Sequence, residues 1–174
     1  MLVINAFSPF IKQLIRPYIY ILVIACTPAV ILCLTPRDSG ASGNDSGFRR
    51  DGRLTWLSKD GSPITTIDVE IAETRIRRGR GLKNRPVPDF SQGMLFIYKN
   101  TAIRTFIMTG TPASLDIIFM DENSRIINIH RQTRPMSDQT YRSSGPARYV
   151  VEVRAGFCDR YGIRPGTRVR WQKK

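Results

Sequence analysis

The chain has few of the residues on which enzymes most often rely. It contains one histidine and three cysteines among 174 residues, and two of those cysteines, Cys26 and Cys33, lie in an apolar N-terminal run. Only Cys158 belongs to the rest of the chain, so no disulfide can form within that part, and the thiol is best interpreted as a small buried hydrophobe. A lone His130 cannot form a metal cluster by itself, so we expect no metal site and an ordinary exposed histidine.

Known catalytic and nucleotide-binding motifs are also missing. The sequence has no G-x-S-x-G motif, no Walker-type phosphate loop, no dinucleotide-binding glycine motif, no H-E-x-x-H and no C-x-x-C. We therefore expect no cofactor. Chemistry would be left to Cys158 with His130, to hydroxyl groups, or to a carboxylate pair such as Asp116 and Glu152, so whether the chain is an enzyme stays open.

Negative charge is scarce. Fourteen Asp and Glu residues stand against 27 Lys and Arg residues, which gives a net charge of +13. Such a surplus attracts polyanions, including nucleic acid, anionic lipid and acidic polysaccharide. The chain has no aromatic-rich RNA-binding strand motif and no zinc finger, and an exported domain rarely meets nucleic acid, so we do not expect nucleic acid to be the partner.

The export signal is the long uncharged run from Ile19 to Leu34, which follows a basic stretch that holds Lys12 and Arg16. This order is typical of a secretion or anchoring signal. As a helix, residues 18–34 would span about 25 Å, slightly less than a hydrocarbon core of about 30 Å. We assign residues 1–36 to a signal or membrane-anchor segment.

Three fates of this segment stay open. It can be an uncleaved anchor, a signal peptide cleaved near Ser39-Gly40-Ala41, or a lipoprotein signal with lipidation at Cys26. Residues 37–50 are rich in Gly, Ser, Asn and Asp and are expected to form a flexible tether, followed by a single globular domain at 51–174. The chain is then exported, either anchored in the inner membrane or periplasmic. Its expected partners are the membrane, anionic lipid or an envelope polymer, and an unknown protein.

Short β-rich segments separated by turn signals dominate the globular part. Thr74 can cap a short helix through about Arg78, a second helical turn is predicted at 157–161, and residues 132–147 read as a polar loop. The predicted strands are 53–58, 64–71, 93–98, 104–111, 115–120, 125–131, 149–154 and 168–171. This pattern predicts an α+β fold with a mostly antiparallel, strongly curved or barrel-like sheet and two short helices.

The densest basic cluster spans the first predicted helix and the loop after it. It could bind phosphate or carboxylate groups, or it could form a solvated helix face and loop. Its members are Arg75, Arg77, Arg78, Arg80, Lys83 and Arg85.

Two acidic residues interrupt predicted apolar strands. Leu115, Ile117 and Phe119 line one face of their strand, which leaves Asp116 on the other face. A carboxylate between apolar side chains is either desolvated and tuned or satisfied by backbone N–H groups, and the structural role is favoured here. For Glu152 the simplest interpretation is a cross-strand ion pair.

Seven short motifs occur in a recognisable order: V-E-I-A-E-T, R-G-L, G-M-L-F, a Phe-x-Met strand, L-D-I-I-F-M-D, Y-x-S-S-G-P-A-R-Y-V-V-E-V-x-A-G and G-I-R-P-G-T-R-V. Together they resemble domain-of-unknown-function family 192, an uncharacterised bacterial and archaeal family whose members are often exported. The resemblance covers about Ile67 to Arg170. It implies a compact single domain and no established biochemical activity. Matching residues are Gly93, Met94, Phe96, Phe106, Met108, Thr111, Asp116, Tyr141, Ser144, Glu152 and Gly156.

The chain departs from the family at one motif. Where the family typically reads Phe-Trp-Met-Lys-Asn-Thr, this sequence has F-I-M-T-G-T at 106–111, so the Trp at 107 and the Lys-Asn pair at 109 and 110 are missing. If those residues serve a ligand in the family, this chain binds something else or nothing.

The leading hypothesis is therefore an exported or membrane-anchored binding or accessory module of the cell envelope. Its candidate ligand site comprises Phe106, Met108, Asp116, Tyr141 and Glu152. The alternative is a small envelope hydrolase or transferase that uses Asp116 or Glu152 as acid or base, which the missing Trp and Lys-Asn weaken. The third hypothesis is nucleic-acid binding through the basic surface.

Overall fold

The computed structural model describes residues 47–174, so the predicted signal or anchor segment, Cys26 and most of the tether lie outside the described residues. Within 47–174 no helix is both long enough and apolar enough to span a membrane. Arg49, which the sequence places in the tether, lies against the domain, because its backbone N–H donates to Glu70 at 3.1 Å.

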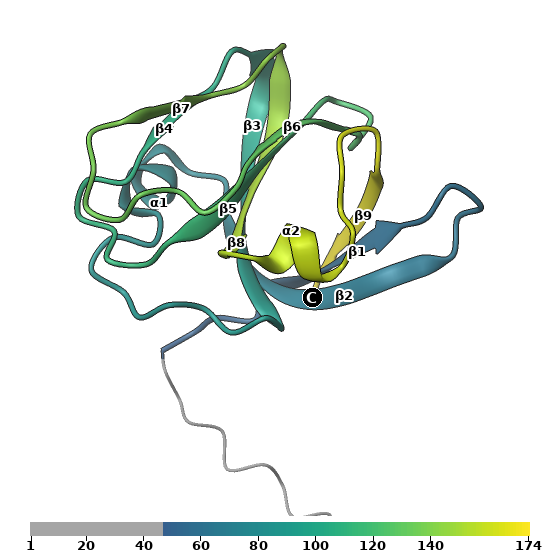
Figure 1. The fold of residues 1–174 in the computed structure, drawn as a ribbon, viewed down its shortest axis with the longest axis horizontal. Helices are drawn as coiled ribbons and strands as arrows, with labels where there is room; N and C mark the ends of the chain where they lie inside the picture. Colours follow the sequence, from purple (N-terminus) through teal and green to yellow (C-terminus); the bar gives the residue numbers. More distant parts are fainter. Residues whose placement is uncertain (1–46) are drawn as a thin grey trace, which may run out of the picture. The chain divides into compact units, whose positions relative to one another are not determined.

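Seven strands form one sheet in the order β6-β5-β8-β3-β2-β1-β9, and β4 and β7 form a separate two-stranded sheet (Figure 1). The strands are β1 (Gly52–Leu57), β2 (Pro63–Ala72), β3 (Gln92–Ala102), β4 (Thr105–Ile107), β5 (Leu115–Met120), β6 (Ile126–His130), β7 (Thr140–Arg142), β8 (Ala147–Arg154) and β9 (Arg168–Lys173). The helices are α1 (Arg75–Arg80) and α2 (Phe157–Arg160).

The α+β class and the two short helices are confirmed, but the sheet is mixed and open. β2 and β3 are parallel, because the connection through α1 carries the chain back before β3 begins, whereas the other neighbouring strands are antiparallel. β6 and β9 are the edges of the sheet, and a single bridge between Arg125 and Arg168 joins them at one end. The prediction of a strongly curved or barrel-like sheet was therefore wrong.

Two element predictions also differ from the structure around β4. The strand predicted at 104–111 ends at Ile107, because the chain turns where the Thr111 N–H donates to the Met108 carbonyl at 2.9 Å. β7 lies inside the predicted polar loop and pairs with β4, with Phe106 opposite Tyr141. A three-residue strand has too short a pattern to be seen without its partner.

The core consists of two clusters, one on each face of the large sheet. The first includes Trp56, Ile118, Val151 and the α2 residue Phe157, and the second includes Phe96, Ile117, Phe119 and Val150. Alternation along β5 and β8 sends successive side chains into different clusters. α2 covers the first face, and β4 with β7 covers the second (Figure 1). Both clusters lie within residues 54–169, so the unit 45–174 contains its whole core.

Gly93 is required by a close approach between β3 and its neighbours. A Cβ atom at this position would lie 2.9 Å from the Glu152 carbonyl oxygen and 2.9 Å from Ile67 Cδ1. We expect Gly93→Ala to lower the free energy of unfolding by about 1–3 kcal/mol in urea denaturation, because the sheet must shift to admit the methyl group. Gly145→Ala, where a Cβ meets nothing within 4 Å, is the control. Equal stability of the two variants would contradict this packing.

Candidate anion-binding site

A cleft of about 440 Å³ opens beside α1. Its walls come from the first described residues, the end of β2, α1, and the loop that follows α1. The lining residues are Gly47, Arg49, Glu70, Ala72, Ile76, Arg77, Arg80, Gly81, Arg85, Pro86 and Met94.

Local sequence signals build the α1 wall of the cleft. Thr74 caps the helix by accepting a hydrogen bond from the Arg77 N–H at 3.2 Å, and the chain leaves the helix at Gly81 with a φ of 50°. Arg77 and Arg80 are three residues apart, which places them on one side of the helix. Both residues therefore line the same cleft.

Glu70 forms the buried acidic floor. It is only 1% exposed. The Arg85 guanidinium binds both carboxylate oxygens, with Nη1 donating to Oε2 at 2.9 Å and Nη2 donating to Oε1. Arg49 adds its backbone N–H bond to Oε1 and a side-chain contact, with Nη2 3.3 Å from Oε2. Hydrogen bonding to Glu70 raises the pKa of Arg85 above its usual value. A buried carboxylate needs such partners, because an unpaired one costs several kcal/mol.

The cleft carries an excess of positive charge. Four arginines line it against one carboxylate, and that carboxylate is occupied by Arg85 and Arg49. Arg77 and Arg80 form no ion pair with any residue in 47–174. Guanidinium groups present planar arrays of N–H donors that match carboxylate and phosphate oxygens, so this arrangement suits an anionic group.

The structure divides the predicted basic cluster. Arg77, Arg80 and Arg85 line the cleft, whereas Arg78 stacks on the Tyr98 ring at 4.7 Å and donates to the Ile97 carbonyl at 3.0 Å. The remaining two, Arg75 and Lys83, are exposed outside the cleft lining.

Sequence reasoning missed Arg49 and Glu70. The signal for Glu70 was available, because it is the one acidic residue inside the apolar run of residues 69–72 at the end of β2. Arg49 gave no signal, since only folding brings the start of the domain back to β2.

The predicted ligand-site residues do not all share one place. Phe106, Met108 and Tyr141 belong to the second core cluster, and Glu152 points to the same face of the sheet. Asp116 lies on the opposite face, because it pairs with Val153 in register while Ile117 pairs with Glu152. The carboxylate pair considered from the sequence is therefore separated by the sheet.

Asp116 holds the start of α2. Its Oδ1 accepts hydrogen bonds from the backbone N–H groups of Gln132 at 2.9 Å and Gly156 at 3.3 Å, and its Oδ2 accepts one from Cys158 at 2.9 Å. Because Gly156 has no side chain to cap the helix, a carboxylate from β5 supplies the cap instead. The structural role favoured by the sequence is confirmed.

Glu152 is a buried acid without a hydrogen-bond partner for Oε2. The residue is 6% exposed, and its neighbours across the sheet are Met94 on β3 and Ile117 on β5. Burial raises the pKa of Glu152 to about 8, so the neutral carboxylic acid is the main form at pH 7. The expected cross-strand ion pair is not found, since neither neighbour carries a charge.

The aromatic members of the predicted site are packed into the core. Phe106 makes edge-to-face contacts with Phe96 at 5.1 Å and Phe119 at 5.7 Å. The Tyr141 hydroxyl accepts a hydrogen bond from the Arg134 N–H at 2.8 Å, and its ring lies 5.4 Å from that of His130. His130 is half-buried, not exposed as predicted, because this ring packing covers it.

The three positions that depart from the family pattern lie around the end of β4. Ile107 is 44% exposed, and the Thr109 hydroxyl bonds to Asp138 on the surface. Gly110 has a φ of 74°, a region that Asn also tolerates, so glycine suits the conformation at a position where the family has Asn. None of the three lines the cleft beside α1.

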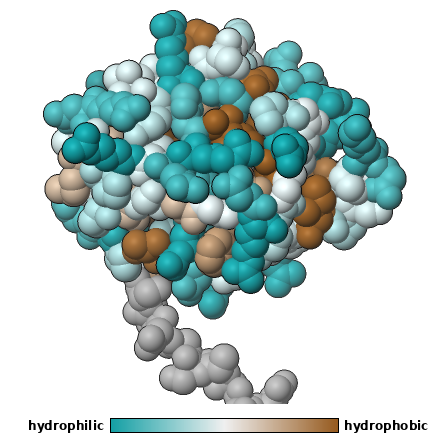
Figure 2. All heavy atoms as spheres, viewed as in Figure 1, coloured by the Kyte–Doolittle hydropathy of each residue, from teal (hydrophilic) through white to brown (hydrophobic). Residues whose placement is uncertain are grey.

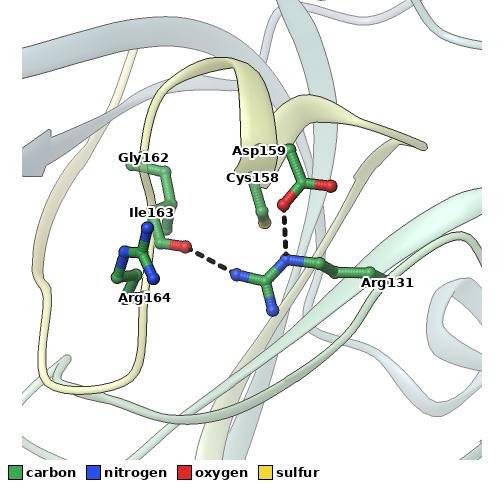
Figure 3. A pocket seen from close by; sticks show the side chains of 6 residues that line it. All are labelled: Arg131, Cys158, Asp159, Gly162, Ile163 and Arg164. Atoms are coloured by element: carbon green, nitrogen blue, oxygen red, sulfur yellow. Dashed lines mark hydrogen bonds and ion pairs between the residues drawn. The ribbon is translucent and has the colours of Figure 1, made fainter.

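A second pocket, of about 300 Å³, lies beside α2 (Figure 3). Its Arg131 is already engaged, with Nε 3.0 Å from Asp159 Oδ1 and Nη2 donating to the Ile163 carbonyl at 2.9 Å. Burial, together with the nearby Asp116 charge, raises the pKa of the Cys158 thiol. The thiol is fully buried, which confirms the prediction of a small buried hydrophobe.

No cluster of three metal-ligating His, Cys, Asp or Glu side chains occurs within the part of the chain that the structure describes.

The comparison with known families decides the relationship. The profile of domain of unknown function 192, described as "Uncharacterized ACR", matches residues 55–171. The chain belongs to this family. No curated protein matches the chain. The resemblance inferred from the seven motifs is therefore confirmed.

Two crystal structures of similar proteins share the fold. One, from Sinorhizobium meliloti 1021, is provisionally described as a transcription regulator; it is 29% identical, covers 71% of this chain and 95% of its own, and has a TM-score of 0.67. The other, a protein of unknown function from Novosphingobium aromaticivorans DSM 12444, is 30% identical, covers 68% of this chain and 84% of its own, and has a TM-score of 0.65.

Asp116→Asn tests the cap on α2. The amide keeps one oxygen but turns an NH₂ group toward a backbone N–H, so we expect the free energy of unfolding to fall by about 2–4 kcal/mol. Urea denaturation of fragment 45–174 gives this value, and the exposed Asp89→Asn is the matched control. A loss no larger than that of the control would mean that Asp116 does not hold α2.

Glu152→Gln tests the buried acid. Because the pKa of Glu152 is about 8 in the folded state and about 4.5 when unfolded, folding retains a proton that the unfolded chain releases. The free energy of unfolding should therefore fall as pH rises from about 4.5 to about 8, and level off above. In the variant this fall should disappear, as measured by urea denaturation at several pH values. Exposed Glu122→Gln should keep it, and an unchanged pH profile in Glu152→Gln would refute the assignment.

Proposed function

We propose that this protein is an exported or membrane-anchored binding module of the cell envelope that holds an anionic group in the cleft beside α1. The observation that carries the proposal is the pair Arg77 and Arg80, two arginines that line one cleft and form no ion pair with another described residue. Buried Glu70 also supports the proposal, because its ion pairs with Arg85 and Arg49 hold these two residues in the cleft wall.

The envelope assignment rests on the apolar run of residues 19–34 and on the basic composition. Phosphate and carboxylate groups are the anions that envelope lipids and polymers present most densely. The cleft combines guanidinium groups with the apolar side chains of Ala72, Pro86 and Met94. A ligand with an anionic group on an apolar or sugar framework would fit both features.

Nucleic-acid binding is the weaker explanation of the charge. The provisional description of the Sinorhizobium protein and the net charge of +13 support it. However, the longest described helix is α1, with six residues, and a helix of this length is about 9 Å long, too short to read several base pairs in a major groove.

Acid catalysis by Glu152 is a second candidate function. The supporting observation is a buried carboxylic acid whose Oε2 has no hydrogen-bond partner and whose pKa lies near neutrality. Asp116 cannot act as its partner across the sheet, so this hydrolase or transferase would need substrate groups on the Glu152 side. Full activity of Glu152→Gln in any reaction found for the protein would exclude this role.

Anion binding can be measured by NMR titration of fragment 45–174 with inorganic phosphate and with citrate. We expect saturable shifts at Ala72, Gly81 and Arg77. The double variant Arg77→Gln/Arg80→Gln should weaken the apparent affinity by at least tenfold, because each charge-assisted hydrogen bond contributes about 1.5–3 kcal/mol.

A matched control separates the cleft from overall charge. The double variant Arg164→Gln/Arg170→Gln also removes two positive charges, but from residues outside the cleft lining. It should bind phosphate and citrate as the unmodified fragment does. If the two double variants weaken binding equally, the anions respond only to net charge and the proposed site is wrong. If only the Arg77→Gln/Arg80→Gln variant loses affinity, native mass spectrometry of protein purified gently from its host's envelope would identify the bound anion by mass.

A further inference from the structure

We infer that α1 and the loop after it form a face that docks onto an anionic lipid surface. This docking face is defined by Arg75, Ile76, Arg80, Lys83 and Val87. The inference rests on the proposed function and adds the partner: the anionic group in the cleft belongs to a lipid headgroup, and apolar side chains beside the cleft enter the lipid surface.

The first argument is the exposure of apolar side chains on this face. Ile76 is 84% exposed, more than any other large hydrophobic residue in 47–174, and Val87 is 44% exposed. Ile76 and Pro86 line the same cleft, and Val87 directly follows Pro86 in the loop after α1. Figure 2 shows that the face in view is mainly hydrophilic, with several separate hydrophobic residues among the polar ones.

The second argument is that α1 lies exposed on the surface of the domain. None of its six residues is buried. The helix is held by the Thr74 cap and by Arg78, which stacks on Tyr98 and donates to the Glu73 carbonyl at 2.6 Å. An isolated helix of this length is unstable in water, so these contacts stabilise a helix whose one large apolar side chain, Ile76, is mostly exposed.

The third argument is charge of a single sign. Arg75, Arg80 and Lys83 are exposed and form no ion pair with another described residue. The nearest acidic residue in sequence, Glu73, is paired with Lys173 at 2.8 Å. Basic residues around exposed apolar side chains are the pattern of segments that lie in the lipid interface. Each basic residue near an anionic membrane raises the partition coefficient by roughly fivefold.

The fourth argument is where the described chain begins. Gly47 lines the cleft, and residues 37–46 come between it and the segment predicted to enter the membrane. Ten residues reach at most about 35 Å. If residues 1–36 anchor the chain, the cleft therefore stays close to the lipid surface, where weak docking is strengthened by the high local concentration.

Vesicle co-sedimentation of fragment 45–174 tests the inference, because this fragment contains the whole core and lacks the apolar segment. Vesicles of phosphatidylglycerol mixed with phosphatidylcholine should bind it, and pure phosphatidylcholine should not. The double variant Arg75→Gln/Val87→Asp changes the docking face outside the cleft lining. It should weaken binding to the anionic vesicles by roughly 25-fold, about fivefold for each site.

The control is Ile64→Asp/Arg164→Gln, which makes the same kinds of change away from α1 and should bind the vesicles normally. Thermal unfolding of each variant verifies that it is folded. Citrate titration separates the two proposals, because Arg75→Gln/Val87→Asp should keep citrate binding in the cleft.

Failure of the unmodified fragment to bind anionic vesicles would overturn the inference, as would equal binding of the two double variants. If citrate binding persists in either case, the proposed anion site stands without the membrane. If citrate binding is also absent from the unmodified fragment, the proposed function fails as well.

Discussion

The buried charge of Glu70 is the constraint on which the cleft depends. A carboxylate that is 1% exposed must be neutralised by partners, and both of its partners come from outside the sheet: Arg85 from the loop after α1 and Arg49 from the start of the domain. The pair therefore ties two surface segments to β2. Their positions help to define the cleft walls, which Arg77 and Arg80 also line without forming an ion pair with another described residue.

The buried acidic residues on the two faces of the sheet differ in their hydrogen bonding. On the first face, the Asp116 carboxylate accepts hydrogen bonds from three backbone N–H groups, and the Cys158 thiol is buried beside it. The second face carries Glu152, whose Oε2 is unsatisfied, and a row across the sheet runs from Glu70 through Met94 to Glu152. Unsatisfied buried polar groups are rare in folded proteins, and Glu152 Oε2 is the one carboxylate oxygen among those found in residues 47–174. Glu152 is therefore the buried acid at which a function should be sought.

The exposed surface of α1 complements this division. Most of the domain's apolar side chains are inside two clusters, yet the helix that borders the cationic cleft presents Ile76 to solvent. A charged cleft next to an exposed apolar side chain suits a partner that is itself amphipathic. A lipid surface has both properties, which is why the proposed function and the inferred docking face agree.

The sequence by itself determined the class of the fold, most strands, the positions of both helices and the family, because hydrophobic alternation, the Thr74 cap and the ordered motifs are local signals. It also indicated that Asp116 is structural, since an acidic residue in an apolar strand has few other solutions. Only the tertiary structure decided that β2 and β3 run parallel, that the sheet stays open, and that β7 exists.

The same limit applies to the site. The sequence found Arg77, Arg80 and Arg85 as a cluster, because they are close along the chain. It could not find Arg49, or separate Asp116 from Glu152, because both depend on strand register and on contacts between distant residues. A one-residue change of register would exchange the faces of a strand, so the side of the sheet on which a charge lies is fixed only when the strands pair.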